Sequence, residues 1–168
     1  MGVEELIPLV GNELTLIARV PKAGSEGGRW TQVHFNRAVA EQFFRITPGD
    51  RRLLTLERIA KNGEYVGRRS RPLVYSASSN KNCKVELEFS PAKNEDYDPD
   101  NRPLVVMTEI DVRRFRYRSL MPGWPGYEEM AELNRSLPRV GRGEPRVITT
   151  LDEVELRWPT VGVRNPRH

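Results

Sequence analysis

The sequence has few of the residues that build metal sites and nucleophilic active sites. Its 168 residues include one cysteine, Cys83, and two histidines, His34 and His168. One cysteine cannot form an internal disulfide, which is typical of proteins kept in a reducing compartment, so we expect a cytoplasmic location. His34 has no cysteine or second histidine near it in the sequence, and neither a Gly-x-Ser-x-Gly nor a phosphate-loop pattern occurs. A zinc site and a cysteine–histidine nucleophile are therefore not expected.

Long apolar runs are also missing. No segment approaches the roughly 18 consecutive apolar residues of a membrane-spanning helix, so we expect no membrane partner. Apolar residues make up 38% of the sequence and charged residues 30%, and the 13 glycines and 13 prolines indicate many turns. No internal repeat and no linker divides the chain. We therefore expect a single domain, residues 1–168, that is long enough to bury a core.

Positive charge is present, and it is unevenly distributed along the chain. The net charge is +4 and the pI is about 9.5. Residues 61–84 contain six cations and one acid, whereas residues 85–111 contain eight acids and two cations. Segregation of this kind favours a basic surface that meets an anionic partner such as nucleic acid.

The apolar pattern predicts mainly short strands. Helical spacing is confined to two short segments, residues 37–44 and 127–135. The dipeptide Asn62-Gly63 is typical of a hairpin turn. Many short strands with two short helices favour a β-barrel or β-sandwich over a parallel α/β sheet. The expected strands are residues 14–20, 30–35, 52–59, 64–66, 73–75, 84–89, 104–112, 113–119 and 154–158.

Alternation along two of these strands predicts which side chains face solvent. In residues 30–35, we expect His34 on the polar face and Val33 and Phe35 in the core. Residues 113–118 alternate arginine with aromatic residues, so we expect a solvated basic strand face there.

Two stretches, residues 22–35 and 68–84, combine cations, amides, hydroxyls and, in the first, glycines. Duplex DNA carries dense phosphate charge, so a protein that binds it needs cations spread over the contact surface. The amides of Gln32, Asn80 and Asn82 suit adenine edges, and glycine allows the backbone to approach phosphate closely. Each residue taken singly is equally typical of a solvated surface or a turn, but the pairing of the two stretches favours a grip on duplex DNA.

The predicted DNA-binding residues share a cationic, amide, hydroxyl, imidazole or stacking side chain. They are Arg19, Lys22, Arg29, Trp30, Gln32, His34, Arg68, Arg69, Arg71, Ser76, Ser78, Ser79, Asn80, Lys81, Asn82 and Lys84.

Two other functions stay open. Asp100, Glu109 and Asp111 resemble the acidic core of a small Mg²⁺-dependent nuclease, although Asp111 stands where that motif has lysine. A barrel that binds RNA or a protein is the other alternative.

Residues 26–44, EGGRWTQVHFNRAVAEQFF, resemble a segment of the N-terminal DNA-recognition (effector) domain of EcoRII-type restriction endonucleases. Residues 151–160, LDEVELRWPT, are similar to the last strand of that domain. Such domains have the DNA-binding pseudobarrel of plant B-three transcription factors. The resemblance implies a mainly β fold, a seven-stranded open pseudobarrel with two short α-helices, which grips the major groove with an N-arm and a C-arm.

By position, Arg29 and His34 match N-arm contact residues of that family, and residues 78–84 match its C-arm. The family has glutamate where this chain has Asn82. The resemblance implies sequence-specific binding of double-stranded DNA, with a CC(A/T)GG-like target.

The resemblance also implies that binding needs no cofactor and that residues 1–168 have no catalytic activity of their own. In the family a separate nuclease domain follows the recognition domain, and Mg²⁺ is expected only for that domain. We expect the fragment to be monomeric.

Changing Asn82 to Ala should cost about 1–3 kcal/mol of binding free energy for the cognate site and relax sequence preference. Lys22→Ala should instead weaken all duplexes alike and flatten the salt dependence, because a phosphate contact carries no sequence information. Competition binding with cognate and scrambled duplexes measures both effects. Equal losses on both duplexes for Asn82→Ala would contradict a base contact.

Overall fold

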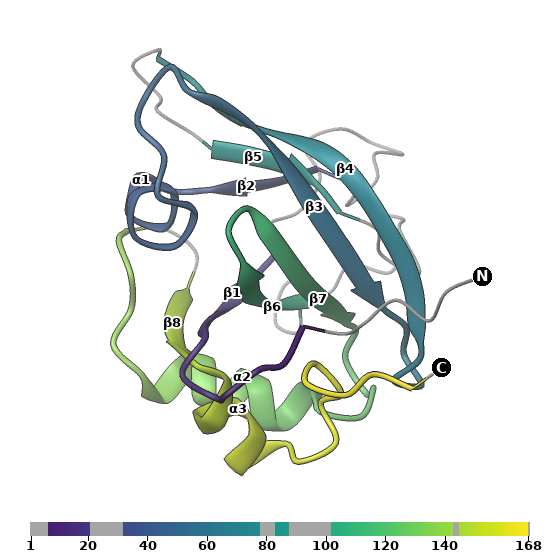
Figure 1. Ribbon diagram of the computed structural model, residues 1–168. Coiled ribbons are helices and arrows are strands. Elements are labelled where there is room, and N and C mark those ends of the chain that lie inside the picture. The colour runs from purple at the N-terminus through teal and green to yellow at the C-terminus, as the bar shows by residue number, and fades with distance from the viewer. Residues whose placement is uncertain (1–6, 21–31, 78–82, 88–101, 143–144, 168) are drawn as a thin grey trace, which may run out of the picture.

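A computed structural model of the protein describes residues 7–20, 32–77, 83–87, 102–142 and 145–167 (Figure 1). These residues form one curled eight-stranded sheet with the strand order β2-β5-β4-β3-β7-β6-β1-β8. Neighbouring strands are antiparallel except β3 and β7, which are parallel. The strands are β1 (Leu14–Arg19), β2 (Gln32–Phe35), β3 (Arg51–Ile59), β4 (Tyr65–Tyr75), β5 (Cys83–Glu86), β6 (Leu104–Asp111), β7 (Arg114–Leu120) and β8 (Arg146–Thr150).

The mainly β, open pseudobarrel predicted from the sequence is confirmed, with eight strands among the described residues in place of seven. Its helices are α1 (Arg37–Val39), which continues into a π-helical turn, η1 (Ala40–Phe44), then α2 (Tyr127–Ser136) and α3 (Leu151–Arg157). None of the described helices is long and apolar enough to cross a membrane.

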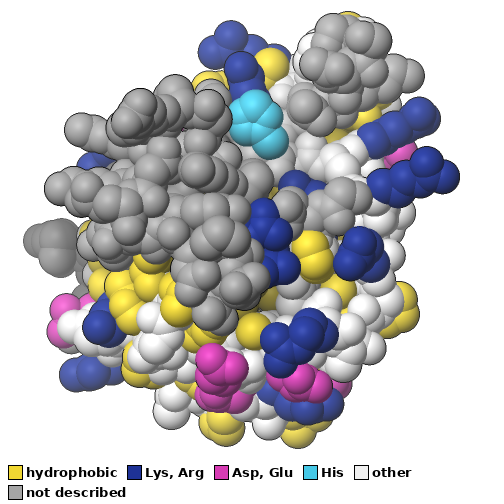
Figure 2. Space-filling model, turned by 180° about the vertical axis from the view of Figure 1, so that it is seen from behind, with side chains coloured by type: hydrophobic (Ala, Val, Ile, Leu, Met, Phe, Trp, Pro, Cys, Tyr) yellow, Lys and Arg dark blue, Asp and Glu magenta, His cyan; other side chains and the backbone are white. Residues whose placement is uncertain are grey.

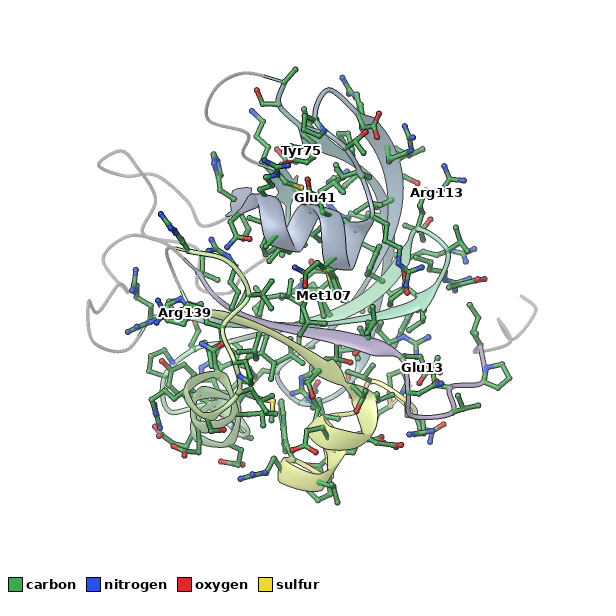
Figure 3. All side chains as sticks on the ribbon, turned by 90° about the vertical axis from the view of Figure 1, so that its left-hand side faces the viewer. Glu13, Glu41, Tyr75, Met107, Arg113 and Arg139 are labelled. Atoms are coloured by element: carbon green, nitrogen blue, oxygen red, sulfur yellow. The ribbon has the colours of Figure 1, made fainter. Side chains whose placement is uncertain are left out.

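Strand β6 is buried on both faces over most of its length, which accounts for its largely apolar sequence. In β6, Val105 and Met107 belong to one hydrophobic core, and Leu104 and Val106 belong to a second. Met107 is fully buried and lies near the middle of the molecule (Figure 3). The side chains of a strand point alternately to its two faces, so each strand in the middle of the sheet supplies both cores.

The first core lies between the sheet and the helical segment that follows β2. Phe43 and Phe44 of η1 contact Phe115 of β7 with ring centroids 5.2 Å apart in both pairs. Asn36 begins this segment, since its Oδ1 accepts a hydrogen bond from the Val39 amide at 2.9 Å. The helix predicted at residues 37–44 is therefore confirmed, although most of it is π-helical.

The second core lies between the opposite face of β1 and β6 and the helices α2 and α3. Met130 and Leu133 of α2 are fully buried there. The helix predicted at residues 127–135 is confirmed.

The predicted strand at residues 154–158, and with it the expected last strand of the resembled family, is wrong. These residues belong largely to α3. The Thr150 hydroxyl accepts a hydrogen bond from the Glu153 amide at 3.3 Å and begins the helix, and Leu151 and Val154 are buried one turn apart. The last strand of the sheet is β8, directly before this helix, where no strand was expected.

The separate strands predicted at residues 64–66 and 73–75 form one continuous strand, β4, which pairs with β3 over its length. The predicted hairpin turn is confirmed. The Asn62 Oδ1 accepts a hydrogen bond from the Glu64 amide at 3.1 Å, and Gly63 has a φ of 89°, which glycine adopts without strain. Because β4 is continuous, the arginines of residues 68–71 lie on a strand.

The solvated face predicted for residues 113–118 is also wrong. Strand β7 lies between β3 and β6, and Arg116 and Arg118 are 0% and 2% exposed. Arg116 Nε donates to Oε1 of the fully buried Glu57 at 2.9 Å, and Arg114 donates to the other oxygen of that carboxylate. Arg116 Nη1 also donates to the Val163 carbonyl at 2.6 Å. A buried carboxylate and the C-terminal segment therefore cover this basic face.

Glu57→Gln should lower the free energy of unfolding by about 3–5 kcal/mol, because it leaves a fully buried guanidinium without its counter-ion. Urea denaturation measures the loss. Glu64→Gln, at an exposed position on the same hairpin, is the matched control and should change stability by less than about 0.5 kcal/mol. Equal small effects of the two substitutions would show that the Glu57 network does not hold the fold.

Candidate nucleic-acid interface

The two outer strands of the described sheet, β2 and β8, are joined by a polar seam. Arg146 Nη2 of β8 donates a hydrogen bond to the His34 carbonyl of β2 at 2.9 Å. Asn36 Nδ2 donates to the carbonyls of Val140 and Arg142, both at 3.0 Å, which lie in the connection between α2 and β8. The open sheet thus curls until its edges are bridged by side chains, and the seam fixes where β2 lies.

A basic row crosses the sheet beside this seam. The strand register places His34 opposite Lys84, Lys84 opposite Val74, and Val74 opposite Arg51. Residues opposite one another in antiparallel strands point to the same face. His34, Lys84 and Arg51 are exposed, so they present one row of nitrogen donors to solvent, and we call these three residues the basic row. Val33 and Phe35 are 1% exposed, so the predicted faces of β2 are confirmed.

The electrostatic environment keeps His34 neutral at physiological pH. Partial burial and the neighbouring charges of Lys84 and Arg146 lower the pKa of the His34 imidazole below its ordinary value of 6.5. A phosphate group beside this imidazole would raise its pKa, because the negative charge favours the protonated form.

The basic row lies between the attachment points of the two predicted arms. Residues 22–31 of the N-arm stretch connect β1 to the start of β2, and residues 78–82 of the C-arm stretch connect β4 to the start of β5. Because β2 and β5 are antiparallel, Gln32 at the start of β2 pairs with Glu86, while Cys83 at the start of β5 pairs with Phe35. The two attachments are therefore at opposite ends of this strand pair, roughly 10 Å apart at about 3.3 Å per residue.

Several predicted binding residues lie outside the described part of the chain. They are Lys22, Arg29, Trp30, Ser78, Ser79, Asn80, Lys81 and Asn82. Gln32 begins β2, and Ser76 is half-buried directly after β4.

The arginines of β4 line a hollow of their own, to which the basic row does not contribute. Arg68, Arg69 and Arg71 border a hollow of about 210 Å³ with Tyr117 of β7 and Glu86 of β5. Arg71 Nε lies 3.6 Å from a carboxylate oxygen of Glu86. These arginines follow β4 from Val74 toward the hairpin turn, so they form a second basic surface along the strand.

Arg19 lies in a third place, at the end of β1. It borders a pocket of about 350 Å³ with Asn134 and Arg135 of α2 and with Arg139 of the following connection. Arg139 lies on the outside of this connection in Figure 3. Lysine and arginine side chains gather on the face shown in Figure 2, around and below the histidine drawn in cyan.

Sequence reasoning missed the contribution of residues 138–146. This connection supplies Arg139 and Arg142, both exposed, and Arg146, which forms the seam. Its spacing of arginines at every third or fourth position was the available signal, but nothing in the sequence shows that this connection folds back beside β2.

The nuclease hypothesis gains no support from the described residues. Glu109 accepts a hydrogen bond from Arg45 Nη2 at 2.8 Å, and Asp111 accepts one from the Val112 amide at 2.8 Å, while Asp100 lies outside the described ranges. Within those ranges, no three His, Cys, Asp or Glu residues form a group that could hold a metal ion. Burial raises the pKa of the Cys83 thiol to about 12, which suits a core residue and not a nucleophile.

Comparison with known proteins places the fold. No model of a protein family matches the sequence, and no curated protein matches it. The N-terminal domain of Helicobacter pylori LlaJI.R1 is similar in structure, with a TM-score of 0.51 and 9% sequence identity over 81% of this chain and 97% of that chain. The B3 domain of the UbaLAI restriction endonuclease, solved with cognate DNA, gives a TM-score of 0.49 and 12% identity over 83% of this chain and 89% of that chain.

At such low identity, the likeness to the LlaJI.R1 domain shows a shared fold. The class that the structure defines is thus an open β pseudobarrel with short helices, and its outer strands are bridged by the polar seam.

Duplex binding should strengthen as the pH falls from about 7.5 to about 5.5. The pKa of His34 is lowered in the unbound protein, and nearby phosphate would raise it, so binding takes up a proton and strengthens as the pH falls through the pKa of the bound state. Fluorescence anisotropy at several pH values measures the affinity. His34→Gln, which cannot be protonated, should lose this part of the pH dependence, and an unchanged slope in that variant would contradict a phosphate contact at His34.

Proposed function

We propose that this chain is a recognition module for double-stranded DNA, which anchors phosphates at the basic row and reads bases in the major groove with the two arms. The observation that carries the proposal is the antiparallel pairing of β2 and β5. It sets His34 and Lys84 between the attachment points of both predicted arms.

The dimensions of this site suit a duplex. The two arm attachments are separated by roughly 10 Å, and the major groove is about 12 Å wide, so segments from both ends of the β2–β5 pair can enter one groove. The basic row between them supplies lysine, arginine and imidazole donors for the phosphates that border the groove. Phosphate contacts then fix the position of the protein on the duplex, and the side chains of the arms supply the sequence preference.

The described fold supports the proposal because the β2–β5 pair holds the attachment points of both predicted arms on one rigid sheet. Binding through cations and amides needs no metal ion, so we propose that recognition is independent of Mg²⁺. The finer proposal follows from the resemblance: a non-catalytic recognition domain of a type II restriction endonuclease, with a CC(A/T)GG-like target and with Mg²⁺ required only by the nuclease domain of the parent enzyme.

Gel-shift binding with and without EDTA tests this function, preceded by selection of bound duplexes from a random library. We expect one enriched sequence and equal affinity in the presence of EDTA. Binding without preference for any duplex over random competitor would overturn sequence recognition, and cleavage by these 168 residues in Mg²⁺ would overturn the absence of catalysis.

Lys84→Gln should weaken binding to all duplexes and reduce the slope of log affinity against log salt by about 1, as expected for one lost phosphate contact. Arg157→Gln removes the same charge from an exposed position on α3, in the part of the molecule remote from β2 and β5, and is the matched control (Figure 1). Equal changes in slope for both variants would mean that net charge, and not the basic row, governs binding.

A further inference from the structure

The end of the molecule opposite to β2 and β5 contains a further cationic site. The hairpin turn between β3 and β4 lies beside the C-terminal segment there (Figure 1). The Tyr65 amide donates to the Arg167 carbonyl at 2.7 Å, and the Arg167 amide donates to the Gly63 carbonyl at 3.0 Å. Between these segments and α3 is a pocket of about 480 Å³.

Arg118 forms part of the wall of this pocket, and its charge has no counter-ion among the described carboxylates. Its side chain is 2% exposed, and its Nη1 and Nη2 donate to the carbonyls of Val161 and Lys61 at 2.6 and 2.7 Å. The guanidinium lies 4.6 Å from the ring centroid of Trp158, and its buried Nε has no hydrogen-bond partner. Burial lowers the pKa of Arg118 to about 10, so the group is still a cation at neutral pH. A buried cation of this kind is costly unless an anion joins it.

Two further cations border the same pocket. Lys61 Nζ lies 4.9 Å from the ring centroid of Trp124, and Arg167 Nη1 donates to the Asn62 carbonyl at 3.3 Å. Both side chains belong to exposed residues.

The acid among the described lining residues, Glu155, does not balance these charges. Arg164 Nη2 donates to a Glu155 carboxylate oxygen at 2.7 Å, so that carboxylate is already paired. Arg118, Lys61 and Arg167 therefore line the pocket, and the acid among its described lining residues is already paired with another arginine.

We propose that this pocket binds a phosphate group, with Arg118, Lys61 and Arg167 as its hydrogen-bond donors. Three cations from three segments suit a tetrahedral dianion better than a planar carboxylate, and charge-assisted bonds to phosphate are strong. The pocket volume lies within the range of small-ligand sites, so a mononucleotide fits as well as inorganic phosphate. A backbone phosphate of nucleic acid has the same chemistry. This site is separate from the proposed duplex-binding face.

NMR of ¹⁵N-labelled protein tests the site, because the indole N–H signal of Trp158 reports from its wall and that of Trp124 reports from beside Lys61. The protein is titrated separately with inorganic phosphate, a mononucleotide and a short duplex, with sodium chloride at matched ionic strength as the reference. We expect saturable shifts of both indole signals that sodium chloride does not produce. The absence of saturable shifts with all three probes would overturn the proposal.

The double variant Lys61→Gln, Arg167→Gln should weaken phosphate binding at least about tenfold, because two of the three charged donors are lost. Both residues are exposed, and two backbone hydrogen bonds still join Arg167 to the hairpin when its side-chain bond to the Asn62 carbonyl is lost, so the fold should persist with little change in the thermal midpoint. Undiminished phosphate binding in this folded variant would also overturn the proposal.

The same titrations show which kind of phosphate the pocket binds. They also test the pocket and the basic row independently. Shifts with inorganic phosphate or the mononucleotide assign the pocket to a small ligand, and shifts with the duplex alone assign it to a backbone phosphate. Lys84→Gln should weaken duplex binding and leave the response to inorganic phosphate unchanged. Loss of the inorganic phosphate response in Lys84→Gln would show that the shifts do not arise at this pocket.

Discussion

The hydrogen bond from Arg146 to the His34 carbonyl is the constraint on which the proposed interface depends. It links β8 to β2, the two outer strands of the described sheet, and so helps to fix how far the sheet curls. The backbone carbonyl of an edge strand would otherwise be open to another chain. With β2 fixed, the register of β5 on β2 determines where Lys84 lies and where both predicted arms begin.

The chain contains 27 lysines and arginines, and the fold uses them in three different ways. Arg116 and Arg118 are buried in a central strand, where a carboxylate and backbone carbonyls accept their hydrogen bonds. Arg146 closes the seam. The exposed cations pair with surface acids, as Arg37 does with Glu41, or face solvent, as Lys84 does. Composition alone cannot separate these uses, because the same guanidinium suits a buried network, a structural link or a phosphate contact.

Local signals predicted much of the fold correctly where a few neighbouring residues decide the structure. The turn at Asn62 and Gly63 and the start of the helix at Asn36 depend on side-chain bonds within three residues, and both were predicted. The prediction failed where distant segments decide. Residues 113–118 have the alternation of a half-exposed strand, but Glu57 and the C-terminal segment, far away in the sequence, bury their arginines. Val154 and Trp158 were assigned to a strand because a short apolar run is compatible with either a strand or a helix. Their packing in the second core selected the helix.

The sequence by itself determined the fold class, the hairpin, the helices at residues 37–44 and 127–135, and the outward direction of His34. Periodicity and turn chemistry act over short distances. The sequence also indicated two stretches with the chemistry of DNA contact. Tertiary structure alone decided which cations are exposed together, that β2 and β5 are neighbours, and that Arg146 joins the sheet edges. These are pairings between segments up to 112 residues apart, and they depend on the packing of two cores that no local pattern contains.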